Sequence, residues 1–351
     1  MTERKKALVT GGATGICSSV LLALARASFI IAGASSILVM LCGSVPVLAQ
    51  EKKAEPQIAV HLLGTGAPIP RVDRFGPATL VSIAGKRLLF DAGRGVSQRL
   101  WQLGIPLGSI DAVFLTHLHS DHLVGLPDLW LTGWLQPVYG QRKTAFRVIG
   151  PNGTRAFTDA LRGGFSSDIM FRSEKEGLPL NGISILAQEI EGEQIVFQEQ
   201  GIIVRNFEVD HGAVKPAYGF RIEYAGKKII ISGDTRFSEN LIRNAQNADV
   251  LIHEVVAAAA PLRETPFVQR QFSYHTSPED LVRIFNATKP KLAVLTHFVL
   301  LGSVNYPAPT SEDVLKELRD RGYAGPAVAG ADLMRIDIGD SVTIAPPIQM
   351  N

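Results

Sequence analysis

The sequence predicts one folded domain of the mixed α/β (α+β) class, in which strands and helices alternate. After residue 57, short apolar runs typical of buried strands alternate with amphipathic segments typical of helices. No linker divides the chain beyond that point. Hydrophobic residues make up 46% of the composition, an ordinary value for a globular protein with a substantial core. We therefore expect a single mixed domain over residues 58–351.

The first 49 residues differ from the rest of the chain. A basic start, "MTERKK", precedes a long stretch that is almost uncharged apart from Arg26. This stretch ends in Val47-Leu48-Ala49, a small-residue pattern that suits cleavage before Gln50. We expect residues 1–49 to be a signal peptide, or a membrane anchor if they are retained, because the stretch could span a bilayer. The protein would then be periplasmic or secreted, and 50–57 would be a linker.

Charge and cysteine content exclude some function classes. The formal net charge of the whole chain is +2, and residues 1–49, the leader, have a net charge of +3. The rest of the chain therefore has a net charge of about −1. A chain without a basic surplus is a poor candidate for binding a polyanion, so nucleic acid is not the expected partner. Both cysteines, Cys17 and Cys42, lie in the leader, so the mature chain would have no disulfide and no thiolate metal site.

The first predicted elements precede a histidine-rich segment. "IAVHLLGTG" (58–66) reads as a buried strand that ends in a glycine turn, and 79–93 as two strands joined around Ala84-Gly85-Lys86. "VSQRLWQLG" (96–104) is a short amphipathic helix that ends at its glycine. "IDAVFLT" (110–116) is an apolar strand. These patterns predict a strand that delivers its last residues to the histidine-rich segment.

The later elements repeat the alternation of strand and helix. The helix that opens the segment 277–298 begins with Ser277-Pro278-Glu279-Asp280, which supplies an N-cap, a first-turn proline and acids near the helix dipole. Residues 166–200 are polar and contain no clear period. The remaining predicted elements are strand 146–151, helix 154–164, strand 201–212, hairpin 218–235, helix then strand over 239–255 and over 277–298, helix 311–322, and terminal strands.

Three histidines and an aspartate occupy six consecutive positions in "THLHSDH". Side chains alternate along a strand, so His117 and His119 point to the same side. The turn that follows can bring Asp121 and His122 back toward them. Nitrogen and oxygen donors at this spacing are typical of zinc, or a pair of zincs, in a site without sulfur. The segment therefore predicts a metal site.

Three further donors stand where predicted apolar strands end. They are His211 after "IIVRNFEVD", Asp234 after "KKIIISG" and His297 after "KLAVLT". One His or Asp at the end of a strand is weak evidence of a functional site. Three such residues, each at the end of an apolar strand, indicate that these side chains lie close to the histidine cluster. By contrast, we expect His61 and His253, inside apolar strands, to be structural.

This pattern resembles the metallo-β-lactamase superfamily over about residues 58–340. The resemblance implies a four-layer αββα sandwich with two zinc ions along one edge; iron or manganese stays open. The motif "LLFDAG" also matches, and its Asp91 would support a ligand or the fold. Carried over position by position, the implied ligands are His117, His119 and His211 for one ion, Asp121, His122 and His297 for the other, with Asp234 bridging.

Within the superfamily, "LIHEV" (251–255) and "HTS" (275–277) resemble signatures of the ribonuclease Z-like branch. The resemblance implies that His275 donates a proton or stabilises an oxyanion, with help from Glu254. Together with Asp121 these are the residues that we expect to be catalytic. Zinc lowers the pKa of bound water from about 15.7 to about 7, so a hydroxide shared by two zincs would attack the substrate.

We expect an exported zinc-dependent hydrolase of a small ester, a sulfate or phosphate ester, because the same branch includes secreted arylsulfatases. A 3′-tRNA-processing endoribonuclease is the less favoured alternative. Family nucleases carry a tRNA-clamping arm between the third and fourth ligand motifs, whereas one hairpin joins His211 and Asp234 here. The charge of −1 and the export signal also oppose it.

Other readings stay open. A lactonase or β-lactamase would use the same metals on a carbonyl carbon, and a non-catalytic binding protein would have no need for the full ligand set. Trp130 and Trp134, in the apolar segment 123–135, form either a wall for a small substrate or a buried helix face. A homodimer is left open.

Overall fold

The computed structural model describes residues 58–345, which form two β-sheets flanked by helices. The eight-stranded sheet has the order β15-β14-β1-β2-β3-β4-β5-β6, and the seven-stranded sheet has the order β13-β12-β11-β10-β9-β8-β7. The strands of the first sheet are β1 (Ile58–Gly64), β2 (Ala78–Ile83), β3 (Lys86–Phe90), β4 (Ala112–Phe114), β5 (Phe146–Pro151), β6 (Ile185–Ile190), β14 (Arg335–Ile338) and β15 (Val342–Ala345). Those of the second are β7 (Ile195–Glu199), β8 (Ile202–Glu208), β9 (Tyr218–Tyr224), β10 (Lys227–Ile231), β11 (Val250–Ala258), β12 (Leu292–Leu301) and β13 (Ala327–Ala329).

The main core lies between the two sheets. One cluster of buried side chains takes members from both, such as Val60 of the first sheet and Ile252 of the second. Phe114 links them, since its ring centroid lies 4.8 Å from that of Phe90 and 5.6 Å from that of Phe220. Strands that are covered on both faces read as continuous apolar runs, which explains why the sequence shows them so clearly.

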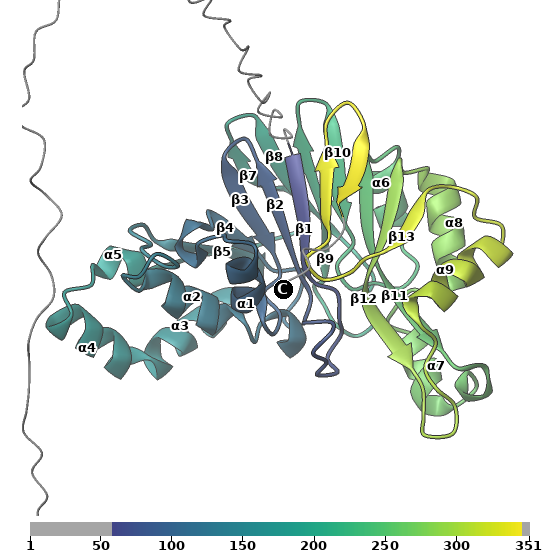
Figure 1. The fold of residues 1–351 in the computed structure, drawn as a ribbon, viewed down its shortest axis with the longest axis horizontal. Helices are drawn as coiled ribbons and strands as arrows, with labels where there is room; N and C mark the ends of the chain where they lie inside the picture. Colours follow the sequence, from purple (N-terminus) through teal and green to yellow (C-terminus); the bar gives the residue numbers. More distant parts are fainter. Residues whose placement is uncertain (1–57, 346–351) are drawn as a thin grey trace, which may run out of the picture. The chain divides into compact units, whose positions relative to one another are not determined.

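Helices cover the two outer faces (Figure 1). On the first sheet, Leu89 packs in one cluster with side chains of α1 (Val96–Gln102) and α2 (Leu126–Trp134). On the second, Leu251 packs in another cluster with side chains from three helices. These are α6 (Glu239–Ala245), α8 (Pro278–Thr288) and α9 (Ser311–Asp320). The result is four layers in the order helix, sheet, sheet, helix, which confirms the predicted fold class.

The segment 166–200, which had no clear period, contains α4 (Ser166–Lys175), α5 (Leu180–Ile183), β6 and β7. It follows α3 (Thr154–Gly164). Helix α4 buries none of its residues, so its sequence carries no apolar stripe. Strand β6 alternates between half-buried and exposed positions for most of its length. The pattern was therefore weak because these elements bury little surface.

The two tryptophans belong to a buried helix face, and the alternative of a substrate wall is wrong. Trp130 and Trp134 of α2 are 0% and 1% exposed. The indole N–H of Trp130 donates to the carbonyl of Ile183 at 2.8 Å, and that of Trp134 to the carbonyl of Pro179 at 2.9 Å. Buried indoles need such partners. These contacts fix α2 against the segment that contains α5.

The predicted signal peptide or anchor (1–49) and linker (50–57) lie outside the described residues. Between residues 58 and 345, none of the helices combines the length and the apolar character needed to cross a bilayer.

Candidate metal centre

The predicted ligands converge where strands of both sheets end at one edge. The chain leaves β4 of the first sheet and reaches His117 and His122, while β8 leads to His211 and β10 to Asp234 of the second sheet. The Oδ2 atom of Asp234 lies at the centre. Its distance is 3.8 Å to His117 Nε2, 3.4 Å to His122 Nε2, 3.9 Å to His211 Nε2 and 3.3 Å to His297 Nε2.

All seven predicted ligands therefore come together. Donor atoms that all lie within 4.8 Å of one another form three overlapping groups, the third of which also includes His275: His117, His119, His211 and Asp234; Asp121, His122 and His297; and Asp234, His275 and His297. Asp234 belongs to two of these groups, and its bridging role stays a prediction. All of these side chains are buried except that of His119, which remains open to solvent.

Asp91 organises the first part of the cluster. It follows β3 with a positive φ of 58°, which turns its carboxylate toward the cluster. That carboxylate accepts from the backbone N–H of Thr116 at 2.8 Å and from its hydroxyl at 2.9 Å, and it lies 2.7 Å from His122 Nδ1. The Thr116 hydroxyl is also 3.0 Å from His117 Nδ1. One carboxylate thus fixes the orientation of two imidazoles, a common support for metal-binding histidines.

Two supporting residues were missed from the sequence. One is Thr116, described above; its place beside the first histidine was the only signal available. The other is Tyr274, whose backbone carbonyl lies 2.9 Å from His211 Nδ1. Tyr274 is 63 residues away in the sequence and uses its backbone carbonyl, which every residue has, so the amino-acid sequence could not indicate this contact.

The prediction that His297 stands at the end of a strand is wrong. β12 continues through it to Leu301, and the pairing with β11 shifts register between Glu254 and Val255. His297 is the extra residue of this β-bulge and has a positive φ of 43°. The apolar residues after it extend the strand, and the bulge turns the imidazole toward the cluster.

Glu254 and His275 form a buried pair beside Asp234. One oxygen of Glu254 accepts from the backbone N–H groups of Thr235 at 3.2 Å and Thr276 at 2.8 Å, and the other lies 3.4 Å from His275 Nδ1. His275 Nδ1 is also 4.0 Å from Asp234 Oδ2. Burial opposes the charged imidazole, but the Glu254 carboxylate outweighs it and raises the pKa of His275 to about 9.

The electrostatics of three ligands suit metal ligation, whereas those of His122 do not in the absence of a cation: burial opposes its charged form, but Asp234 and Asp91 raise the pKa of His122 well above its usual range. Burial, and then the charge of His122, lowers the pKa of His117 well below its usual range, and burial lowers the pKa of His211 to about 4. Burial opposes ionisation of Asp234, but the neighbouring His297 and His122 lower the pKa of Asp234 well below its usual range. A metal binds neutral imidazole and ionised carboxylate, which are the forms favoured here for these three side chains.

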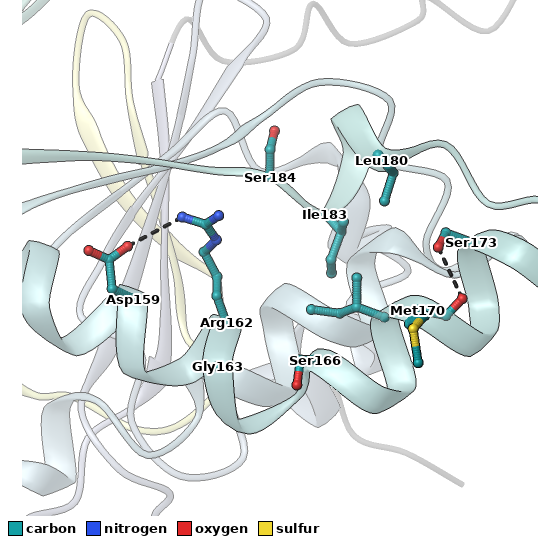
Figure 2. A pocket seen from close by; sticks show the side chains of 10 residues that line it. Asp159, Arg162, Gly163, Ser166, Met170, Ser173, Leu180, Ile183 and Ser184 are labelled. Atoms are coloured by element: carbon teal, nitrogen blue, oxygen red, sulfur yellow. Dashed lines mark hydrogen bonds and ion pairs between the residues drawn. The ribbon is translucent and has the colours of Figure 1, made fainter.

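A separate cavity of about 780 Å³ lies among α3, α4 and α5 (Figure 2). Its lining includes Met170, Leu180 and Ile183, and Arg162 at its edge donates to Asp159 on the same helix at 3.3 Å. None of the predicted site residues lines it. The chemistry is therefore at the strand edge rather than in this cavity.

Comparison with known proteins agrees with the fold and the cluster. The family model described as "Beta-lactamase superfamily domain" matches residues 86–298. The chain belongs to the beta-lactamase superfamily. Within this superfamily it is 33% identical over 287 residues to the "Ribonuclease Z" of Mycobacterium marinum (strain ATCC BAA-535 / M), an alignment that covers 80% of this chain and 99% of the relative. It is 32% identical to the "Ribonuclease Z" of Mycobacterium bovis (strain BCG / Pasteur 1173P2), with 80% and 98% covered.

Solved structures of the superfamily share the fold. The crystal structure of human tRNase Z, short form, aligns with a TM-score of 0.60 at 24% identity and covers 80% of this chain and 99% of that one. Zn(2+)-bound PqqB from Methylobacterium extorquens aligns with a TM-score of 0.55 at 18% identity, with 80% and 100% covered. These structures show the fold; the sequence relatives, together with the donor cluster, make the chain a ribonuclease Z-like, metal-dependent hydrolase.

These relatives overturn two predictions. The main expectation of a small sulfate or phosphate ester hydrolase is wrong, and so is the prediction that nucleic acid is an unlikely partner, because the relatives are named ribonuclease Z. The argument from the missing arm fails because the alignment includes nearly the whole M. marinum protein, which leaves no room for a long extra segment. The argument from net charge fails because a sum over the chain does not describe the charge at one edge.

Proposed function

We propose that this protein is a metal-dependent endoribonuclease that cleaves precursor tRNA on its 3′ side. The observation that carries the proposal is the convergence of seven imidazole and carboxylate donors in a chain that aligns with nearly the full length of proteins named ribonuclease Z. Cleavage of a phosphodiester requires charge stabilisation at the phosphate and a proton for the leaving oxygen. The cluster and the His275–Glu254 pair can supply these two needs.

The donor set fits a pair of metal ions. His117 Nε2 and His122 Nε2, which lie 3.8 and 3.4 Å from Asp234 Oδ2, are buried and have no hydrogen-bond partner among residues 58–345. Leaving buried polar atoms unpartnered is costly, so the arrangement favours a bound cation. We infer two zinc ions, because nitrogen and oxygen donors without sulfur suit zinc. His117, His119 and His211 would hold one, Asp121, His122 and His297 the other, and Asp234 both.

Bound metal would supply Lewis acidity, which acidifies water and neutralises charge on phosphate oxygens. The chain's own contribution is to hold a proton. Glu254 is anchored through one oxygen by two backbone N–H groups and faces His275 Nδ1 with the other. Since His275 Nδ1 faces Glu254 and Asp234, we infer that its other ring nitrogen, Nε2, donates to the leaving oxygen. Glu254 acts through His275 and is a positioning residue.

Two exposed cations lie close in sequence to residues of the cluster and are suited to RNA phosphates. Lys215 lies four residues after His211, and Arg270 lies five residues before His275 on α7 (Pro266–Phe272). Both are exposed, and neither forms an ion pair with another described residue. Each phosphate contact contributes to a salt-dependent affinity. A few such side chains suffice to bind RNA even when the net charge of the chain is small.

The test uses the full-length chain with its metal content measured by elemental analysis. A 5′-labelled precursor tRNA with a 3′ trailer should be cut at one position, and mature tRNA should not be cut. We expect His119→Ala to lose about one metal ion and at least about 100-fold in cleavage rate. Ser120→Ala, an exposed neighbour, serves as the matched control. Hydrolysis of an aryl sulfate by a metal-loaded enzyme that leaves every RNA intact would contradict the ribonuclease while preserving the metal centre.

A further inference from the structure

A second cavity lies at the opposite end of the first sheet. Its volume is about 400 Å³, and it is lined by strands β14, β1, β2 and β3 and by Leu103, Gly104 and Ile105 after α1. β3 runs from Lys86 and Arg87 at this cavity to Phe90, which precedes Asp91 of the metal cluster. The cavity is therefore separated from the metal edge by the length of a strand.

The strand register explains the hollow. Asp337 is paired with Ala59, Ala59 with Ser82, and Ser82 with Arg87, so these four side chains lie in one row on the outer face. Ala59 and Ser82 in the middle of the row are small. The next row on the same face brings Arg335 opposite His61. Small residues in the middle and large polar residues around them leave a concave polar surface.

The charges around this cavity leave one cation free. Arg335 Nε donates to Asp337 at 2.7 Å, so this pair is neutral as a unit. Lys86 points to the other face, where its ammonium lies 3.2 Å from Asp111 and 3.1 Å from Glu199. The Arg87 guanidinium has no ion pair with any described residue. The cavity thus carries a net charge of about +1, which suits a monoanion.

His61 supplies a directional polar group. It is 9% exposed, and its Nδ1 is buried without a hydrogen-bond partner in the described part of the chain. Burial, and then the charge of Arg335, lowers the pKa of His61 to about 4, so the ring is neutral at pH 7 and can donate one N–H. Leu103 and Ile105 add an apolar wall.

We propose that this cavity binds a small organic monoanion, in which a carboxylate or phosphoryl group sits on a compact apolar body. The anionic oxygens accept from Arg87, the Ser82 hydroxyl and His61, and the apolar body packs on Leu103 and Ile105. The volume lies within the range of about 300–1,000 Å³ that is usual for small-molecule sites.

Binding can be tested on the metal-loaded, full-length protein with ring-labelled histidines. Benzoate and phenylphosphonate are the two anionic probes, and benzamide is the neutral control of the same shape. We expect either anion to shift the His61 ring signals saturably and benzamide to leave them unchanged. If the anions shift only His119 or His275, they bind at the metal centre and the proposal fails.

Variants separate the charge from the shape. Arg87→Met should weaken benzoate binding about tenfold or more, because it removes a charge-assisted hydrogen bond to the anion. Arg155→Met, at an exposed arginine of α3 that has no ion pair within residues 58–345, should change it less than about twofold. Ser82→Leu fills the hollow and should abolish binding even if Arg87→Met does not fold. Unchanged affinity in a folded Arg87→Met protein would overturn the proposal.

Discussion

Replacement of Asp91 tests whether one carboxylate organises the metal centre. Asp91→Ala removes the acceptor for three buried groups: the Thr116 N–H at 2.8 Å, its hydroxyl at 2.9 Å and His122 Nδ1 at 2.7 Å. A buried group left unsatisfied costs about 1–3 kcal/mol. These groups share one carboxylate and are not additive, so we expect a loss of about 3–6 kcal/mol in the free energy of unfolding. The positive φ of Asp91 adds strain for alanine.

The measurement is urea unfolding of the metal-loaded protein, with metal affinity determined by chelator competition. Asp91→Asn keeps one carbonyl acceptor and tolerates the left-handed backbone, so it should fold and yet bind metal about 10–100-fold more weakly. Asp73→Asn, at an exposed aspartate, is the control. If Asp91→Ala stays within about 1 kcal/mol of the wild type and retains its metal, the supporting role assigned to this carboxylate is wrong.

Three further outcomes are expected. Glu254→Gln should lower kcat for RNA cleavage on the order of 10–100-fold and leave KM little changed. Glu264→Gln is the control and should change neither constant. A change in KM alone would argue against a role of Glu254 in proton transfer. The pKa of His61 is lowered to about 4 in the folded state, whereas it is about 6.5 in the unfolded chain. Between these values the unfolded chain takes up a proton more readily, so the free energy of unfolding should fall by about 3 kcal/mol as the pH drops from above 6.5 to about 4. His61→Phe should remove that part of the slope in urea unfolding, and an identical slope would refute this. Trp130→Phe loses the hydrogen bond to Ile183 and should lower the free energy of unfolding, measured in urea, by about 1–3 kcal/mol. KM should not rise. A raised KM would support the alternative that Trp130 contacts the substrate.

The sequence predicted the cluster well because its ligands follow buried strands. Apolar runs locate strand ends, and strands of a sheet deliver their end residues to a shared edge. Asp234 and His211 could be placed in this way. His297 was assigned to the same edge for the wrong local reason, since a β-bulge inside a strand has no apolar signature of its own.

Other parts could not be predicted. Helix α4 buries no residue, so no apolar stripe marks it. The carbonyl of Tyr274 supports His211 through the backbone, which is independent of side-chain type. The substrate class was inferred from the net charge, a missing insertion and a predicted export signal, and none of these describes the local surface that contacts a ligand. Such properties depend on tertiary placement.

The bulge at His297 has a consequence for how the ligand relates to its strand. Before it, Leu292 and Val294 face the inner core and Ala293 and Leu295 the outer one; after it, Phe298 again faces outward. Removal of His297 would leave this alternation unbroken, so a chain lacking that one residue could pair and pack as an ordinary ladder. His297 is inserted into a strand that is complete without it, and it does not replace another residue of the strand. Deletion of His297 should therefore abolish catalytic activity and change the stability of the fold little.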